Sequence, residues 1–298
     1  MSLENAILET LVYSDIFDYP LTIGELHRYL VAPAEQDDVL RCVAQMNKID
    51  SHDGYYFLSG RYEIVHVRIQ RESASRKVYK QAITYGRILG SLPFVRMVAL
   101  TGSLAVMNLS SAADIDYMLV TQTGRLWTAR AFAVTFARMM RPFGHTICVN
   151  LLVSEKVLTW PQQDLYPARE ICQMIPITGI DVYQRLRAAN LWTKTILPNS
   201  GMSAPNLLEV PSRNQPNQIQ RLLESPLSGK HGDRLEEWTR KYQMQRTARR
   251  FGIGSETNFT EDVCQANFHN HRKLTDEFYN ARLASLGLVE HAREMAEI

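Results

Sequence analysis

The sequence has few cysteines, and none of its four stands in the closely spaced pairs that bind zinc. Cys42, Cys148 and Cys172 lie among apolar residues, which indicates buried thiols in a reducing compartment rather than a disulfide framework. No stretch approaches the roughly 18 consecutive apolar residues of a membrane span. The N-terminus also lacks the basic and apolar regions of a signal peptide. We therefore expect a cytoplasmic protein with no membrane partner.

An excess of charge of one sign is also missing. The 33 basic residues nearly balance the 31 acidic ones, and the formal net charge is +2. Charge alone therefore does not predict a nucleic-acid-binding protein, although a local basic patch would still permit one. The 298 residues are 45% hydrophobic and 21% charged, as in a globular protein with a substantial core. No Walker phosphate loop, Rossmann glycine motif or Ser/His/Asp nucleophile set occurs.

Residues 1–60 are expected to form a winged helix-turn-helix, made of short helices closed by a β-hairpin. Thr22 and Glu25 have the spacing of a capping box and predict a helix over 23–30. Apolar spacing predicts another helix over 36–46, and Asp53-Gly54 predicts the hairpin turn. DNA is a conceivable partner of this unit. However, the helix over 36–46 begins with acidic side chains that repel phosphates, so a packing or protein-contact role is favoured.

The rest of the chain predicts an α/β (α+β) fold with a mixed sheet and flanking helices. Residues 61–92 are expected to be a helical connector, 93–200 the α/β domain, and 201–298 a linker and a helical C-terminal region. Within these parts we expect strands over 95–100, 115–121 and 146–153, and helices over 124–140, 235–250 and 271–284. From 154 to about 199 the pattern is helical.

One short segment carries most of the predicted chemistry. Gly102 and Ser103 end a strand and open a helix, where free backbone N–H groups can bind an anion. The missing side chain of Gly102 lets a phosphate approach the backbone, and the Ser103 hydroxyl can donate to a phosphate oxygen. Asp114 and Asp116 are two residues apart and should share one face of the next strand. Two adjacent carboxylates favour a hard divalent cation, Mg²⁺ or Mn²⁺.

The segment 102–120 resembles the signature of the DNA polymerase β-like nucleotidyltransferase superfamily, in which Gly-Ser and an acidic-x-acidic strand stand in this order. The wider chain resembles uncharacterised bacterial nucleotidyltransferase-domain proteins with an N-terminal winged helix. That wider resemblance rests on the stretches 13–20, 124–130, 148–150 and 189–192, and on Leu197-Pro198. It implies a nucleotidyltransferase-type sheet, with Asp114 and Asp116 as catalytic and metal-binding residues and Gly102 and Ser103 as nucleotide-binding residues.

Active members of the superfamily have a third carboxylate on a later strand. The matching strand here has no Asp or Glu, and Asn150 stands at the corresponding position. An Asn oxygen can coordinate a metal but cannot act as a general base. Glu155 follows the strand and is a possible substitute, although the shift of position changes the face it occupies.

Two functions remain open at this point. The first is a metal-dependent nucleotidyltransferase that moves a nucleoside monophosphate from a nucleoside triphosphate to a protein, RNA or small-molecule acceptor. The alternative is a catalytically degenerate nucleotide-binding sensor or regulator that uses the winged helix as its output module. The missing third carboxylate favours the sensor, and the intact Gly-Ser and acidic pair favour retained metal and nucleotide binding.

Overall fold

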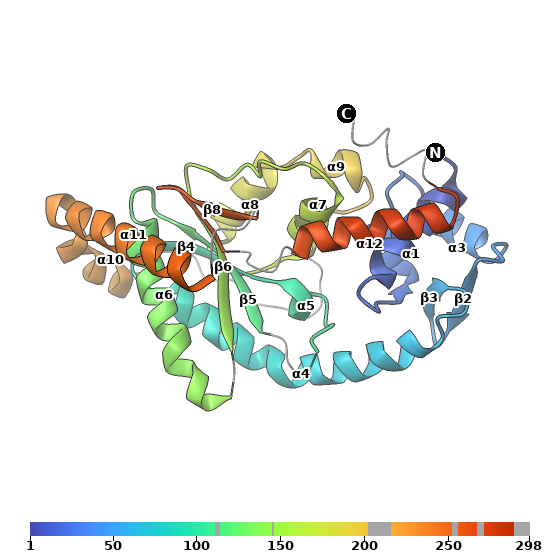
Figure 1. The fold of residues 1–298 in the computed structure, drawn as a ribbon, viewed down its shortest axis with the longest axis horizontal. Helices are drawn as coiled ribbons and strands as arrows, with labels where there is room; N and C mark the ends of the chain where they lie inside the picture. The colour runs from blue at the N-terminus through green and yellow to red at the C-terminus, as the bar shows by residue number, and fades with distance from the viewer. Residues whose placement is uncertain (111–113, 145, 202–215, 252–255, 267–270, 289–298) are drawn as a thin grey trace.

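The computed structural model describes residues 1–110, 114–144, 146–201, 216–251, 256–266 and 271–288. Over this part of the chain the protein is mixed α/β, with twelve α-helices and two β-sheets. Figure 1 shows an elongated molecule with the N-terminal elements at one end, the larger sheet in the middle, and α10 and α11 at the other end. None of the described helices is both long enough and apolar enough to cross a membrane.

The N-terminal elements form the short helices and the hairpin expected from the sequence. The Thr22 side chain accepts from the backbone of Glu25, and the Glu25 carboxylate accepts from the backbone of Thr22, so the capping box is confirmed. The hairpin turn at Asp53 and Gly54 has positive φ angles of 52° and 79°. A small sheet has the order β1-β3-β2. The elements are α1 (Leu3–Asp15), β1 (Leu21–Thr22), α2 (Ile23–Arg28), α3 (Gln36–Val43), β2 (Ile49–His52) and β3 (Tyr55–Leu58).

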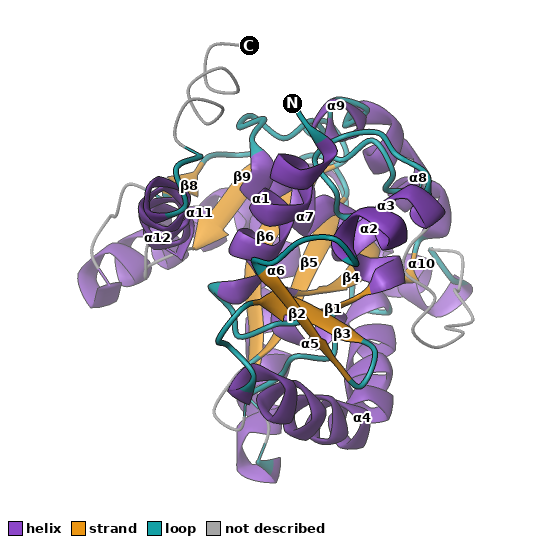
Figure 2. Cartoon of the chain, turned by 90° about the vertical axis from the view of Figure 1, so that its right-hand side faces the viewer, coloured by secondary structure: helices purple, strands orange, loops and turns teal. Residues whose placement is uncertain are grey.

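The larger sheet has six strands in the order β7-β4-β5-β6-β9-β8. Its centre is mixed, because β5 is antiparallel to β4 and parallel to β6. Figure 2 shows the small sheet in front of this one, with α4 on one side and α7 to α9 on the other. The strands are β4 (Val95–Thr101), β5 (Ile115–Thr121), β6 (Ile147–Ser154), β7 (Ile175–Thr178), β8 (Thr257–Phe259) and β9 (Val263–Ala266).

Three strands lie where the sequence pattern indicated helix. β7 falls in the region expected to be helical, and β8 and β9 fall in the C-terminal region expected to be a linker and helices. β9 pairs with β6, so the sheet extends beyond the boundary expected at residue 200. These strands have only three or four residues each, too few to show a clear alternation. β7 also contains Pro176, which is tolerated there because β7 is an edge strand.

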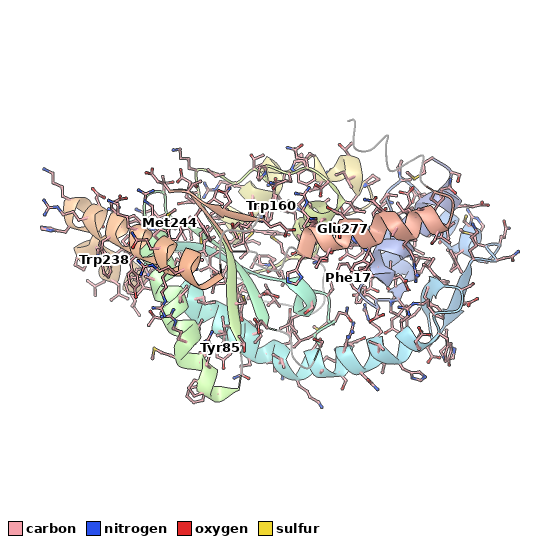
Figure 3. All side chains as sticks on the ribbon, viewed as in Figure 1. Phe17, Tyr85, Trp160, Trp238, Met244 and Glu277 are labelled. Atoms are coloured by element: carbon pink, nitrogen blue, oxygen red, sulfur yellow. The ribbon has the colours of Figure 1, made fainter. Side chains whose placement is uncertain are left out.

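The C-terminal helices pack at both ends of the molecule. α10 (Gln218–Glu224) and α11 (Gly229–Phe251) pack beside β4 and α6, and α12 (His271–Ser285) lies along α1 (Figure 1). The helices expected over 235–250 and 271–284 are confirmed. On α11, Met244 packs against the core and Trp238 is exposed (Figure 3). Most of the linker expected from residue 201 lies outside the described residues.

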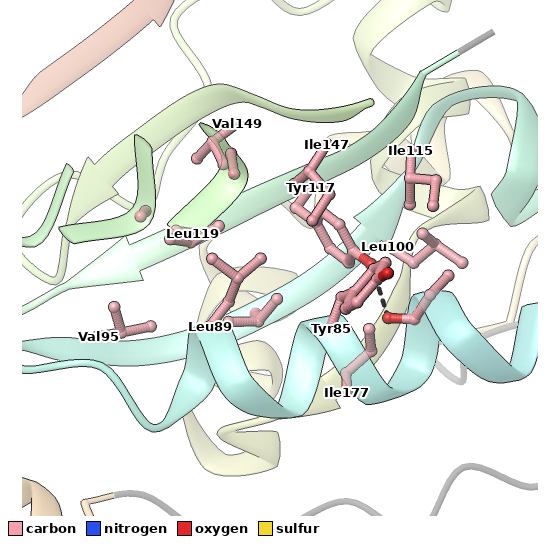
Figure 4. Packing of buried hydrophobic residues seen from close by; sticks show 14 of the residues in the cluster. Tyr85, Leu89, Val95, Leu100, Ile115, Tyr117, Leu119, Ile147, Val149 and Ile177 are labelled. Atoms are coloured by element: carbon pink, nitrogen blue, oxygen red, sulfur yellow. Dashed lines mark hydrogen bonds between the residues drawn. The ribbon is translucent and has the colours of Figure 1, made fainter. Parts of the chain in front are cut away.

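The core lies on both faces of the six-stranded sheet. On one face, alternate residues of β4 and β5 pack against α4 (Glu63–Gly90) and α6 (Leu126–Met140). Figure 4 shows this layer, in which the Tyr117 hydroxyl donates to the Ala82 carbonyl oxygen at 2.6 Å. The other face is covered by α7 (Leu165–Gln173), α8 (Ile180–Ala189) and α9 (Thr193–Ile196). The two layers hold the ends of β4 and β5, and therefore the Gly-Ser segment, in a fixed place.

Candidate functional site

Gly102 lies directly against the Asp116 carboxylate. It begins α5 (Gly102–Ala105), immediately after β4, and its φ angle is +64°. A Cβ atom at this position would lie 2.5 Å from Asp116 Oδ2, closer than nonbonded atoms approach. Both the backbone conformation and the contact therefore require glycine here. The structure thus brings together two of the residues that the sequence singled out separately.

The helix that Gly102 opens is very short. α5 has four residues, a single turn, so its macrodipole contributes little at the site. What it offers an anion is the set of N–H groups that the first turn of a helix leaves without helical partners. The half-buried Ser103 hydroxyl has no hydrogen-bond partner among the described residues.

Asp116 is held between two neighbouring strands, opposite Thr101 of β4 and Cys148 of β6. The pKa of its carboxyl is raised to about 7, mainly by burial and also by the negative charges of Glu170 and Asp114, while a hydrogen bond from Cys148 opposes the rise. Burial also raises the pKa of Asp114, which precedes β5 and is half-buried. The other charged groups that shift the pKa of Asp116 are thus both acidic, which is the environment that a bound cation would relieve.

Glu170 is a further carboxylate at this site, and no pattern in the sequence singled it out. It lies on α7 and lines the same cavity as Asp116, and burial raises its pKa to about 7. Gln173 donates to Glu170 Oε1 at 2.7 Å from the next turn of the helix. The nearest sequence signal is a charged pair, Arg169-Glu170, inside an otherwise apolar helical turn. That pattern does not say which neighbour the two side chains meet.

Asn150 and Glu155 are the two candidates for the position of the third carboxylate. Asn150 is in β6 at an irregularity in the pairing with β5, where Tyr117 pairs with Val149 and Met118 with Leu151. Its side chain lies outside what the structure describes. The Glu155 carboxylate pairs with Arg185 at 2.6 Å and is not among the described residues that line the cavity. The structure therefore provides no support for Glu155 as a substitute.

The site opens into a cavity of about 390 Å³. Gly102, Ser103, Asp116 and Glu170 line it, whereas Asp114 is not among the described residues that do so. Other walls come from the N-terminal helices and from α12, so the N-terminal elements contribute directly to the cavity. Phe17 and Trp160, labelled in Figure 3, belong to the lining. The N-terminal contribution consists of Tyr13, Ser14, Phe17, Tyr19 and Tyr29.

The donor set suits a cation that shares its ligands with a bound phosphate. Among the described residues, no three His, Cys, Asp or Glu side chains are grouped closely enough to enclose a metal ion. Mg²⁺ does not require such a cage, because it is commonly bound by one or two carboxylates together with substrate phosphates and water. The Asp116 carboxylate beside the Gly102 backbone fits this mode of binding.

Comparisons of the chain with protein-family models, curated proteins and solved structures gave no match. The resemblance to the nucleotidyltransferase superfamily therefore rests on this chain's own residues. Of these, Gly102 and Asp116 are in contact, and Ser103 lines the cavity beside them.

The raised pKa of Asp116 predicts a pH-dependent stability in the absence of metal. Between about pH 4 and 7 the folded state holds a proton that the unfolded state has released, so this group lowers the free energy of unfolding as the pH rises. At pH 8, Asp116→Asn should be more stable than wild type by about 1–3 kcal/mol, since one pKa unit corresponds to about 1.4 kcal/mol and partial solvation reduces the total. At pH 5 the two proteins should differ much less. Denaturant unfolding in EDTA at both pH values measures this difference, and a difference independent of pH would contradict the prediction.

Proposed function

We propose that the chain is a metal-dependent nucleotidyltransferase, built from a nucleotidyltransferase-type sheet behind a winged helix-turn-helix. It would transfer a nucleoside monophosphate from a nucleoside triphosphate to an acceptor. The observation that carries the proposal is the contact between the Asp116 carboxylate and the Gly102 backbone, at the wall of a cavity that also contains Glu170. A carboxylate that can bind a metal and a helix start whose backbone N–H groups can bind phosphate therefore line one cavity, which supports the proposal.

Each group has a distinct part in the proposed chemistry. Gly102 and Ser103 would bind the terminal phosphates, and Asp116, together with Asp114 just before β5, would hold Mg²⁺ or Mn²⁺. When bound, the cation neutralises charge on the triphosphate. The acceptor hydroxyl oxygen forms a bond to the α-phosphorus, the bond from that phosphorus to the bridging oxygen breaks, and pyrophosphate leaves. Glu170 accepts the hydroxyl proton, because a carboxylate with a pKa near 7 suits a general base at neutral pH.

The first test is the thermal stability of the purified protein with each nucleoside triphosphate, with and without Mg²⁺. A ligand that binds only the folded state raises the unfolding midpoint, and at a hundred times its Kd the gain is about 2.7 kcal/mol, or several degrees. We expect a rise that requires Mg²⁺ in wild type and is lost in Asp116→Asn and reduced in Asp114→Asn.

Asp181→Asn is the matched control for this test. Asp181 is an exposed residue of α8 and does not line the cavity, so its variant should respond to nucleotide as wild type does. No rise with any nucleotide, or an equal rise in Asp116→Asn, would refute the nucleotide site. A positive result would be followed by a search for transfer of label from the α-phosphate.

The second candidate function is a nucleotide sensor without transfer activity. Asn150 favours it, because the strand that carries a carboxylate in active members of the superfamily has none here. The contribution of the N-terminal helices to the cavity also favours it, since a ligand there would touch the proposed output module. The sensor would bind the triphosphate with Mg²⁺ and release no pyrophosphate.

DNA is a weaker candidate for the partner of the N-terminal unit. α3 exposes Asp37 and Asp38 in its first turn, and the exposed Arg41 is paired with Asp38. A surface with this charge would repel a phosphate backbone. We therefore favour a role for the unit in ligand binding within the chain.

A further inference from the structure

Arg169 is a buried cation at the wall of the cavity. Its side chain is 6% exposed, and no ion pair joins it to a carboxylate of the described residues. Its guanidinium group lies over two tyrosine rings, 4.7 Å from the ring centroid of Tyr13 and 4.1 Å from that of Tyr29. Nη2 donates to Ser14 Oγ at 2.6 Å, while Nη1 is buried and has no hydrogen-bond partner. Nη2 is therefore fixed by a hydrogen bond, and Nη1 is available to donate to a ligand.

The other two buried arginines of the described residues, Arg68 and Arg187, both have partners within the protein. Arg68 is 4% exposed and pairs with the Glu25 carboxylate at 2.8 Å. Arg187 is 2% exposed and donates to the backbone oxygens of Ile171 and Gly201, both at 3.0 Å. Neither is among the residues that line the cavity, whereas Arg169 is. A buried charge without an ionic partner costs free energy, and an anion in the cavity would remove that cost.

The residues that hold the guanidinium come from the far end of the sequence. Tyr13 and Ser14 belong to α1, and Tyr29 follows α2, whereas Arg169 is on α7 beside Glu170. The planar fork of an arginine matches the oxygens of a phosphate group, and contact with the faces of two aromatic rings restricts the orientation of that plane. A phosphate is also the anion that the Gly102 backbone and the Asp116 carboxylate with its cation would accept.

We propose that Arg169 binds a phosphate group of the ligand in this cavity, and that Tyr13, Ser14 and Tyr29 hold the guanidinium in position for it. The N-terminal unit is then part of the binding site rather than a separate module. The inference rests on the proposed function only for the identity of the molecule that carries the phosphate. The affinity of the subsite for phosphate requires no metal.

The test is the binding of inorganic tripolyphosphate to the full chain in EDTA, followed by the thermal unfolding midpoint across a titration. Arg169→Lys keeps the charge but loses the fork, and we expect its apparent Kd to rise about tenfold or more. Ser14→Ala keeps the arginine and removes the bond that orients it, and a rise of about threefold to tenfold is expected. Arg187→Lys, a buried arginine away from the cavity, should bind tripolyphosphate as wild type does even if its midpoint is lower.

The outcomes separate this inference from the proposed function. Undiminished binding in Ser14→Ala and Arg169→Lys, or no response of wild type to tripolyphosphate, overturns the subsite. If Arg169→Lys does not fold, Ser14→Ala decides alone. A third outcome is that Arg169→Lys and Ser14→Ala lose tripolyphosphate binding, while the response of wild type to nucleoside triphosphates does not depend on Mg²⁺. This outcome would support the subsite and refute the transferase.

A parallel titration with a nucleoside triphosphate and Mg²⁺ identifies the source of the phosphate. A weakening in Arg169→Lys similar to that for tripolyphosphate assigns the subsite to the phosphate chain of the nucleotide. Unchanged nucleotide affinity, with tripolyphosphate binding lost, assigns it to a phosphate carried by the acceptor.

Discussion

Replacement of Glu170 by Gln is expected to lower the rate of pyrophosphate release by about 10²–10⁴-fold, the usual contribution of a general base. Gln has the size of Glu but cannot accept a proton from the acceptor hydroxyl. Its amide oxygen can still accept the hydrogen bond that Gln173 donates at 2.7 Å, so α7 should keep its place. Nucleotide binding with Mg²⁺ should persist, because Glu170 is not assigned to the metal. The measurement is pyrophosphate release from a nucleoside triphosphate, together with transfer of its α-phosphate label.

Glu155→Gln is the control for this experiment. Glu155 pairs with Arg185 and is not among the described lining of the cavity, so its variant should release pyrophosphate at the wild-type rate. An equal loss in both variants would argue against a base at Glu170. A rate in Glu170→Gln within about threefold of wild type would do so as well. If wild type binds nucleotide but releases no pyrophosphate, the sensor is the better description of the protein.

Replacement of Gly102 by Ala should both destabilise the fold and abolish the effect of Mg²⁺ and nucleotide on the unfolding midpoint. The φ angle of +64° is unfavourable for alanine, and the new Cβ would lie 2.5 Å from Asp116 Oδ2. Left-handed backbone and overpacking together cost about 2–4 kcal/mol. Relief of the contact requires the Asp116 carboxylate to move, and the proposed cation site moves with it. Denaturant unfolding measures the first effect, and the nucleotide-dependent midpoint measures the second.

Gly124→Ala is the control that separates the effect of backbone strain from the effect of the contact with Asp116. Gly124 has a similar φ angle of +74°, but a Cβ there would meet no atom within 4 Å. This variant should show only the backbone cost, about 1–2 kcal/mol, and an unchanged response to nucleotide. If the two alanine variants lose the same stability and both keep the nucleotide response, the contact between residues 102 and 116 has no functional consequence.

The central part of the fold could be predicted because its signals are local. β5 is nearly all apolar, as a strand covered on both faces must be, and it spans the expected residues. The capping box of Thr22 and Glu25 and the hairpin turn at Asp53 and Gly54 also depend only on neighbouring residues. Short strands such as β7 and β9 were missed because three or four residues carry little periodicity, and their pairing partners decide their conformation.

The sequence by itself identified Gly102, Ser103 and Asp116, because a Gly-Ser turn after a strand and an acidic residue in an apolar strand are visible in a few consecutive residues. It did not show that Asp114 lies just before β5 and outside the described lining of the cavity. Only the tertiary structure decided that Glu170 and Asp116 line one cavity, and that the rings of Tyr13 and Tyr29 pack against the Arg169 guanidinium. The sequence around a charged residue in a helix does not indicate which distant residue its side chain will contact. Its partner is selected when helices from opposite ends of the chain pack on the same sheet and exclude water from the space between them.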